Sequence, residues 1–317
     1  MRIAVVGGSI AGLECGINLA DEHEVTIFEE HDEIGYPLQC GEGWMSVIEP
    51  YGFVTNEIDT LLLRKLDVRH MEVKDVVRYD VRGSMLVIDR PKMEKLMARE
   101  AIKRGCEIVV GRKVRIGELV KEYDIVIDAS GHPSQYDREF GKKPRGAVGL
   151  QARCKLDCEE AIMDVCSAID GYFWVFPKGD GTANVGVGYW KKKAGWFRLR
   201  EQLDRYIEFL GGEALWYTGG TIGMGLNRPF VRFVGETPVA MVGDSAGMAD
   251  PYYGEGMTKA VAAARILAEC VENLEDYEPR FMRALGRIYR ESMFAYTLRR
   301  ASLLFPVVKL FRLRSRF

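Results

Sequence analysis

The chain begins with two short apolar runs separated by a glycine-rich turn and a helical pattern. Ile3–Val6 and Val25–Phe28 are four-residue runs without a charge, and the residues from Gly12 to Ala20 repeat apolar side chains at helical spacing. Short apolar runs bounded by glycine predict buried strands, and the intervening periodicity predicts a helix. The first 28 residues therefore predict a strand, a tight turn, a helix and a second strand.

Similar patterns recur later, and a strand-rich segment lies between them. Pro238–Val242 predicts another buried strand and Gly254–Cys270 an alanine-rich helix, while Leu61–Arg90 alternates as strands do, with a hairpin turn at Arg82–Ser84. The stretch 146–189 is mostly of strand type. The remaining predicted elements are helices at Pro91–Arg104 and Ala194–Leu210 and strands at Cys106–Val110, Tyr123–Asp128, Gly171–Pro177 and Ala183–Tyr189. We therefore predict an α/β (α+β) protein whose ends enclose an inserted antiparallel β-sheet.

The glycine-rich turn after the first strand has the chemistry of a pyrophosphate site. In the string GGSIAG at Gly7–Gly12, backbone N–H groups and the positive end of the next helix can face an anion. Ser9 replaces the usual second glycine of G-x-G-x-x-G, and its side chain is small enough for the backbone to approach the pyrophosphate closely. The second strand ends at Glu29 and Glu30, where a carboxylate can bind an adenosine ribose and would repel the extra phosphate of NADP. For this motif alone, a ligand-free turn is the alternative.

A second glycine-rich string, VGDSAGMADPYYGEGM at Val242–Met257, narrows the interpretation. Asp244 follows a predicted strand and can hydrogen-bond a ribityl chain, while the turn Gly254–Gly256 brings a helix N-terminus towards a flavin. The partial positive charge of that helix end would stabilise the anion of a reduced isoalloxazine. A nicotinamide enzyme has no need of this second element, so the pair predicts a Rossmann-like FAD-binding domain assembled from both ends of the chain.

The predicted domain boundaries follow from these motifs. Residues 1–65, 85–145 and 236–275 are assigned to a discontinuous FAD-binding domain, and residues 66–84 and 146–235 to a substrate domain. Residues 276–317 are assigned to a C-terminal helical, basic tail.

The composition excludes several classes of function but does not identify one. The 317 residues have a net charge of −2, which gives no whole-chain case for nucleic acid binding. The seven cysteines include no C-x-x-C and no histidine at metal-ligand spacing, so we predict neither a metal site nor a disulfide framework. No apolar run approaches the ~18 residues of a membrane span, and no signal peptide is evident. We therefore predict a cytoplasmic protein.

The last residues combine basic and apolar side chains. No acidic residue follows Glu291, whereas six basic residues are interleaved with leucine, phenylalanine and valine between Arg299 and Phe317. Such a segment suits the anionic inner face of a cell membrane. A helix packed on the protein, with solvated arginines, is the alternative.

Four strings occur in an order typical of one flavoprotein family: GGSIAG, PLQCGEG at Pro37–Gly43, YFWVFP at Tyr172–Pro177, and GDSAGMADPYYGEG. The sequence resembles the FAD-dependent geranylgeranyl reductase family, digeranylgeranylglycerophospholipid reductases included, which has the fold of p-hydroxybenzoate hydroxylase. The resemblance spans about residues 1–270, and Y-x-W-x-F-P is its specific part. It implies reduction of C=C double bonds in geranylgeranyl groups of lipids or their precursors by hydride transfer from reduced FAD.

The resemblance implies roles for particular side chains. Cys40 would lie near the isoalloxazine and the substrate, as a proton donor or as a passive contact; the alternative is a small residue that fills a tight turn. Tyr172, Trp174 and Phe176 alternate along one strand and so share a face, which is either an aromatic wall for a polyisoprenoid chain, ending at Pro177, or ordinary sheet core. Tyr172 is a second candidate proton donor.

Further residues are assigned to the cofactor. Arg90 matches a family position that reaches FAD, with a surface arginine as the alternative, and Ser130 stands where relatives have an acidic residue. The predicted FAD-contacting residues are Gly7, Ser9, Ala11, Gly12, Glu29, Glu30, Cys40, Gly41, Arg90, Ser130, Gly131, Gly243, Asp244, Gly254, Glu255, Gly256 and Met257.

Other functions fit the same motifs. The W-x-F-P string is close to the W-x-I-P of flavin halogenases, so a monooxygenase or halogenase is an alternative, although Tyr172 and Phe176 favour the reductase. A non-catalytic flavin electron carrier or prenyl-lipid binder is another. Since no second nucleotide motif is evident, NADPH and ferredoxin both stay open as the electron donor. Only 61 residues follow Gly256, which is fewer than in many relatives. This predicts a substrate tunnel that is more open, or covered by other elements.

Overall fold

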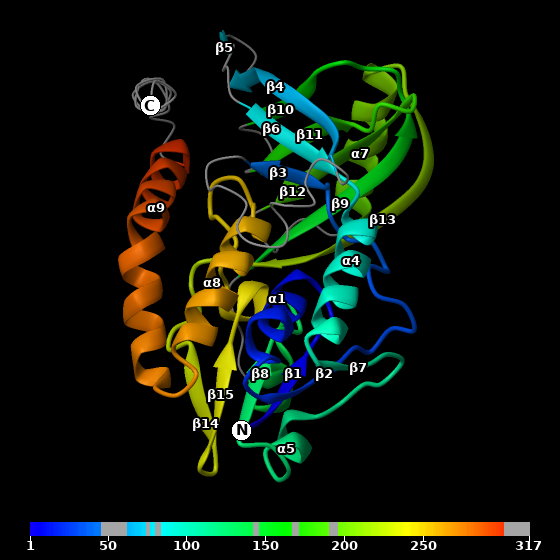
Figure 1. Cartoon of the computed structure of the whole chain (residues 1–317). Coiled ribbons are helices and arrows are strands. Elements are labelled where there is room, and N and C mark those ends of the chain that lie inside the picture. The colour runs from blue at the N-terminus through cyan, green and yellow to red at the C-terminus, as the bar shows by residue number, and fades with distance from the viewer. Residues whose placement is uncertain are drawn as a thin grey trace.

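A computed structural model describes residues 1–45, 62–73, 77–79, 84–141, 146–166, 171–189 and 196–300. The strands of these residues form two sheets, one in the lower and one in the upper half of the molecule as drawn in Figure 1. Two predicted features, the hairpin turn centred on Gly83 and the basic segment 301–317, lie outside the described residues.

The lower sheet has the order β14-β15-β8-β1-β2-β7 and is parallel except for the edge strand β14. Its strands are β1 (Arg2–Val6), β2 (Glu24–Phe28), β7 (Glu107–Val109), β8 (Ile125–Asp128), β14 (Val231–Val234) and β15 (Thr237–Met241). Val126 of β8 lies opposite Val239 of β15 in the parallel register. This pairing confirms that one Rossmann-like sheet is assembled from both ends of the chain.

Four helices stand side by side along this half in Figure 1: α4 (Arg90–Lys103), α1 (Ile10–Leu19), α8 (Met257–Glu269) and α9 (Tyr277–Arg300). Helix α1 packs against both α4 and α8, and α9 packs against α8. Asp89 caps α4 by accepting a hydrogen bond from the Lys92 N–H (3.1 Å), and Pro91 occupies the first turn, where no N–H is needed. Two short helices, α5 (Ile116–Leu119) and α6 (Gln135–Glu139), were not predicted.

The upper sheet has nine strands, in the order β13-β9-β12-β11-β10-β4-β6-β3 with β5 paired to β4. They are β3 (Gly43–Met45), β4 (Leu62–Val73), β5 (Val77–Tyr79), β6 (Ser84–Ile88), β9 (Gly146–Lys155), β10 (Ala161–Cys166), β11 (Gly171–Pro177), β12 (Thr182–Tyr189) and β13 (Glu213–Gly223). All pairs are antiparallel except that of β10 with β4. The predicted inserted antiparallel sheet is therefore confirmed, with one parallel pair within it.

The two faces of the upper sheet have different neighbours. Helix α7 (Trp196–Phe209) covers one face with Leu199, Leu203 and Ile207, which recur at helical spacing and pack against Val175 and the other buried valines of the sheet. Alternate residues of β11 point to the opposite face, because side chains alternate along a strand. That face meets the lower half and forms one wall of the site. Among the described residues, no helix has the length and apolarity needed to cross a bilayer.

Candidate flavin and lipid site

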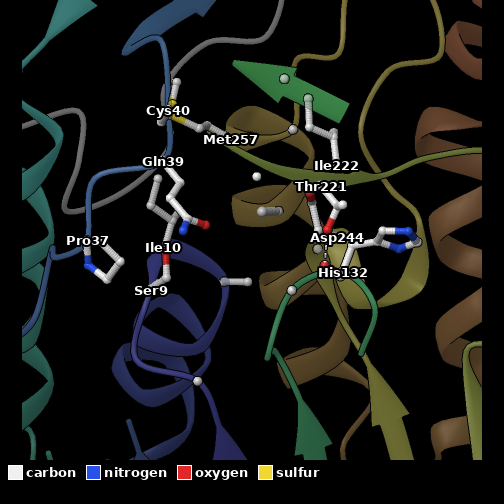
Figure 2. Close-up of a pocket in the computed structure, with 18 of the residues that line it drawn as sticks. Ser9, Ile10, Pro37, Gln39, Cys40, His132, Thr221, Ile222, Asp244 and Met257 are labelled. Carbon is white, nitrogen blue, oxygen red and sulfur yellow. Dashed lines mark hydrogen bonds between the residues drawn. The ribbon is translucent and has the colours of Figure 1, made fainter. Parts of the chain in front are cut away.

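A cavity of about 700 Å³ lies between the two halves. Figure 2 shows loop residues Pro37, Gln39 and Cys40 on one side of it and Thr221 and Asp244 on the other. The predicted site residues that line it are Gly7, Ser9, Ala11, Glu29, Glu30, Cys40, Gly41, Arg90, Ser130, Gly131, Tyr172, Trp174, Phe176, Gly243, Asp244, Gly254, Glu255, Gly256 and Met257. Residues chosen from distant parts of the sequence therefore converge on one space.

The turn after β1 forms one end of this cavity. Gly7 has a φ of +107°, which favours glycine, and a Cβ at Gly12 would stand 2.0 Å from the Gly7 carbonyl oxygen. The Gly8 N–H donates to Glu29 Oε2 (2.7 Å), so the carboxylate at the end of β2 is held against the turn. Gly12 does not line the cavity itself: it allows the turn to close beneath it.

Arg90 is not a surface arginine but part of a compact polar cluster at the start of α1. Its Nη2 donates to Ser9 Oγ (2.6 Å) and its Nε to Glu94 Oε1 (3.0 Å). The same Glu94 oxygen accepts from Ser9 Oγ (2.6 Å) and from the Ile10 N–H (3.2 Å), so a carboxylate caps this helix end. Glu94 was not predicted, because within a helical pattern it looks like any solvent-facing glutamate.

The late glycine string forms the opposite end. Asp244 Oδ2 accepts a hydrogen bond from the Gly223 N–H (3.0 Å). Burial raises the pKa of Asp244 to about 6, although the Gly223 bond and the charge of Arg90 lower it. Gly254 has a φ of +69°, and α8 begins at Met257, three residues later than the start predicted for this helix. The three-residue glycine turn that precedes α8 is thus a connection rather than its first turn.

Ser130 and its neighbours close the central strand of the lower sheet. Ser130 Oγ donates to Asp128 Oδ1 (2.6 Å) and accepts from the Gln135 N–H (2.7 Å). Asp128 is fully buried and also accepts from the Tyr136 N–H (2.8 Å). Ser130 therefore shapes the loop around Gly131, where the chain lines the cavity.

Cys40 lies where the loop after Pro37 meets the upper sheet. Its sulfur accepts a hydrogen bond from the Glu42 N–H (3.3 Å), and its carbonyl oxygen accepts one from Gln151 Nε2 (2.7 Å). Burial raises the pKa of the Cys40 thiol, while the guanidinium of Arg90 opposes that shift. The thiol is therefore protonated at neutral pH, and a cation stands beside it.

The aromatic residues of β11 form a continuous wall of the cavity. The ring centroids of Tyr172 and Trp174 are 5.7 Å apart, and those of Trp174 and Phe176 are 6.4 Å apart. Phe173 points to the other face and stacks on Tyr206 at 4.4 Å. The predicted common face is thus confirmed, whereas Pro177 ends the strand without lining the cavity.

The hydroxyl of Tyr172 donates to the carbonyl oxygen of Tyr253, in the loop before α8. This bond joins the aromatic wall to the late glycine string.

Several lining residues were not predicted. They include Gln39, Gln151, Tyr253 and the segment Thr218–Ile222 of β13. Thr218 lies opposite Gln151 in the register of β13 and β9, so the two strands present them together. The string that contains Gln39 was recognised, but nothing in the sequence of β13 marks it as part of a site. Across the described residues, no cluster of three histidine, cysteine or acidic side chains is arranged to hold a metal ion.

Comparison with known proteins agrees with this geometry. Residues 153–214, which include β11, match the family model described as the geranylgeranyl reductase catalytic domain. The digeranylgeranylglycerophospholipid reductase of Thermoplasma acidophilum is 28% identical over 343 positions, which cover 91% of this chain and 83% of the relative. The protein of the same name from Methanothrix thermoacetophila is 27% identical, over 90% of this chain and 84% of its own.

Solved structures share the whole architecture. A geranylgeranyl bacteriochlorophyll reductase-like protein from Thermoplasma acidophilum has a TM-score of 0.74 at 22% identity, covering 100% of this chain and 91% of its own. A flavin-dependent brominase has a TM-score of 0.69 at 14% identity, covering 98% and 93%. At these identities the likeness shows the fold, that of flavin-dependent hydroxylases and halogenases. Together with the family match and the relatives, it confirms the resemblance seen in the sequence: the chain is similar to proteins of the geranylgeranyl reductase family.

Proposed function

We propose that this protein is an FAD-dependent oxidoreductase that reduces C=C double bonds of geranylgeranyl groups in lipids or their precursors. One observation carries the proposal: the glycine turns of both chain ends, the Cys40 thiol and the aromatic face of β11 line a single cavity. The family match over 153–214 and the names of the relatives support the lipid class.

The lower wall of the cavity fits FAD. The turn residues Gly7, Gly8, Ser9 and Ala11 line the cavity at the start of α1. The partial positive charge of this helix end suits a pyrophosphate, although its Ile10 N–H is bonded to Glu94. Glu29 suits the adenosine ribose, Arg90 and Ser9 the pyrophosphate, Asp244 the ribityl chain, and the N-terminus of α8 the flavin pyrimidine. When bound and reduced, FAD supplies the hydride. We accordingly assign the cofactor to the discontinuous domain and the lipid to the inserted sheet.

Cys40 is the proposed proton donor. An unactivated alkene accepts hydride poorly, so a proton must be delivered to develop positive character on the carbon that receives the hydride. The raised pKa keeps the Cys40 thiol protonated, and the guanidinium of Arg90 stabilises the thiolate left once the proton has gone. Tyr172 is the second candidate, but its hydroxyl proton is engaged by the Tyr253 carbonyl oxygen.

Tyr172, Trp174 and Phe176 form the proposed wall for the isoprenoid chain. A largely apolar surface excludes water from the alkene and holds it in one orientation, which lowers the entropic part of the barrier.

We also propose that residues 302–317 contact an anionic membrane surface, because the basic and apolar composition of this segment suits one. Deleting Ser302–Phe317 should reduce sedimentation of the protein with anionic liposomes. If binding is unchanged, the segment has no such role. NADPH and ferredoxin are both chemically suitable as the reductant.

The test is anaerobic mixing of chemically reduced, FAD-loaded protein with a geranylgeranyl glycerolipid, with flavin absorbance and lipid mass followed together. Flavin reoxidation matched by a gain of two hydrogens per turnover supports reduction. A flavin that stays reduced until oxygen is admitted, with a hydroxylated or halogenated product, supports an oxygenase or halogenase. Reversible flavin chemistry with an unchanged lipid under both conditions supports an electron carrier or lipid binder.

A further inference from the structure

Glu42 is the most heavily bonded buried carboxylate near the cavity. Its side chain is 1% exposed and accepts four hydrogen bonds. The donors are the Arg90 N–H to Oε1 (3.0 Å), and Lys178 Nζ (2.7 Å), Asn184 Nδ2 (2.9 Å) and Arg153 Nη2 (3.1 Å) to Oε2. Hydrogen bonds to a buried charge are among the stronger ones in proteins. One carboxylate thus joins the loop after Pro37, the start of α4 and strands β9 and β12.

The backbone around Glu42 is held by the same neighbours. Asn184 Nδ2 also donates to the Gly41 carbonyl oxygen (2.9 Å), and Lys178 Nζ donates to the Ile88 carbonyl oxygen (2.8 Å). The Ile88 N–H donates to the Glu42 carbonyl oxygen (3.0 Å). The loop is therefore fastened on both sides of Glu42, to β12 and to β6, which are two strands of the upper sheet.

Glu42 has a left-handed backbone, with a φ of +65°. This conformation costs free energy for a residue with a Cβ, so it persists only where surrounding contacts enforce it. The adjacent Glu42 N–H donates to Cys40 Sγ. The conformation of residue 42 thereby determines where that sulfur is held.

The side chain of Glu42 points away from the main cavity. Cys40 and Gly41 line the main cavity, whereas Glu42, Arg153 and Lys178 line a second one of about 650 Å³ on the other side of the loop. Tyr36, Pro37 and Thr218 line both cavities, but Glu42 lines only the second.

We propose that Glu42 is a positioning residue, which holds the Cys40 thiol at the reaction site by fastening its loop to both halves of the molecule. The inference rests on the proposed function only for what the thiol does there. The placement of the thiol is a separate matter and can be measured without turnover.

The charges around Glu42 predict that removal of its carboxylate lowers the stability of the protein. Glu42 faces two cations, Arg153 and Lys178, and burial lowers the pKa of Lys178 while Glu42 raises it. Replacing the carboxylate leaves buried cations unpaired, which destabilises the fold as well as the loop. A test must therefore separate stability from positioning.

The test compares Glu42→Gln with Glu14→Gln. Glu14 is the matched control, because it is also 1% exposed and paired with an arginine, Arg265 (3.0 Å), but lines neither cavity. The first readout is the rate at which iodoacetamide alkylates Cys40 in the oxidised, FAD-loaded protein, followed by mass spectrometry of the Cys40 peptide. The second is kcat and KM for the geranylgeranyl lipid.

We expect Glu42→Gln to change the alkylation rate of Cys40 at least about fivefold and to lower kcat at least about tenfold, with KM little changed, because a misplaced proton donor slows the chemical step. Glu14→Gln should change neither value more than about twofold. The Glu42→Gln, Lys178→Met double variant, which also removes one of the two cations, should regain part of the lost stability without regaining the wild-type thiol reactivity.

If Glu42→Gln does not fold, Asn184→Ala removes the tether to Gly41 without changing the charge and takes its place in the comparison. Alkylation and kcat within twofold of wild type in these variants, or equal changes in Glu14→Gln, would overturn the inference. A wild-type protein that leaves the lipid unchanged refutes the proposed reaction, but the alkylation comparison still decides the role of Glu42.

Discussion

The two walls of the main cavity are built in different ways. The lower wall is built around two backbone turns, Gly7–Gly12 and Gly254–Gly256, which are joined by side chains such as Glu29, Arg90 and Asp244. The upper wall is made of side chains such as Gln151, Trp174 and Thr218, which come from three strands brought together by sheet register. In the proposed function, the turns bind the cofactor in the same way for any flavin reaction, whereas the side chains of the upper wall select the substrate. A brominase can therefore share this fold at 14% identity.

The largest expected effect comes from breaking the backbone wall. Gly12→Ala places a methyl group 2.0 Å from the Gly7 carbonyl oxygen, so the turn must open. FAD binding should weaken at least about 100-fold, or about 2.7 kcal/mol, as measured by flavin fluorescence titration. Gly117→Ala, whose new methyl group would make only an ordinary 3.5 Å contact in α5, should leave FAD affinity unchanged. Equal affinities for the two variants would contradict the backbone cradle.

The next effect separates chemistry from cofactor binding. Cys40→Ala should lower kcat for lipid reduction by about 100-fold or more, the usual contribution of a general acid, with FAD affinity unchanged. Stopped-flow reoxidation of the reduced protein with lipid measures the step directly. Cys158→Ala is the control, since that half-buried thiol lines neither cavity. A rate within threefold of wild type in Cys40→Ala would assign the proton to another donor.

A pair of substitutions on β11 sharpens the contrast between its two faces. Trp174→Leu removes aromatic area from the cavity wall and should raise KM for a geranylgeranyl lipid roughly tenfold. Phe173→Leu, one residue away on the α7 side, should lower the free energy of unfolding by about 1 kcal/mol and leave KM unchanged. Steady-state kinetics measures KM for both variants, and urea unfolding measures their free energies of unfolding. Equal KM values would show that the aromatic face is core rather than a lipid wall.

The last prediction concerns how the stability of the protein without FAD depends on pH. Since the pKa of Asp244 is raised to about 6, the folded state holds this proton more tightly than the unfolded chain does. The stabilisation is complete below the unfolded pKa near 4 and is lost progressively as pH rises through about 6. Thermal unfolding of wild type and Asp244→Asn across this range measures it. The difference between the two should change with pH, and a constant difference would contradict the shift.

Much of the lower half was predictable because its signals are local. An apolar run, a glycine turn and a helix follow one another within 20 residues, and the conformations that glycine alone adopts easily mark the turn. The common face of Tyr172, Trp174 and Phe176 was also predictable, since alternation along a strand needs no tertiary information.

The partners of these residues were not predictable in the same way. Glu94 caps a helix 84 residues away in the sequence, and Gln151 holds the carbonyl oxygen of Cys40 across 111 residues. Thr218 joins the same wall only through the pairing of β13 with β9. No periodicity reports such contacts, because they depend on how strands and helices are arranged rather than on the order of neighbouring residues.

By itself, the sequence determined the fold class, the use of both chain ends for one parallel sheet, the resemblance to geranylgeranyl reductases and 19 of the residues that line the cavity, because turns, strands and helices are encoded by nearby residues. Only the tertiary structure decided that Arg90 is tied to Ser9 and Glu94, that Tyr172 donates to Tyr253, and that Glu42 fastens the Cys40 loop to both halves. A buried charge is stable only where partners from distant segments surround it, so its position is known only once the chain has folded.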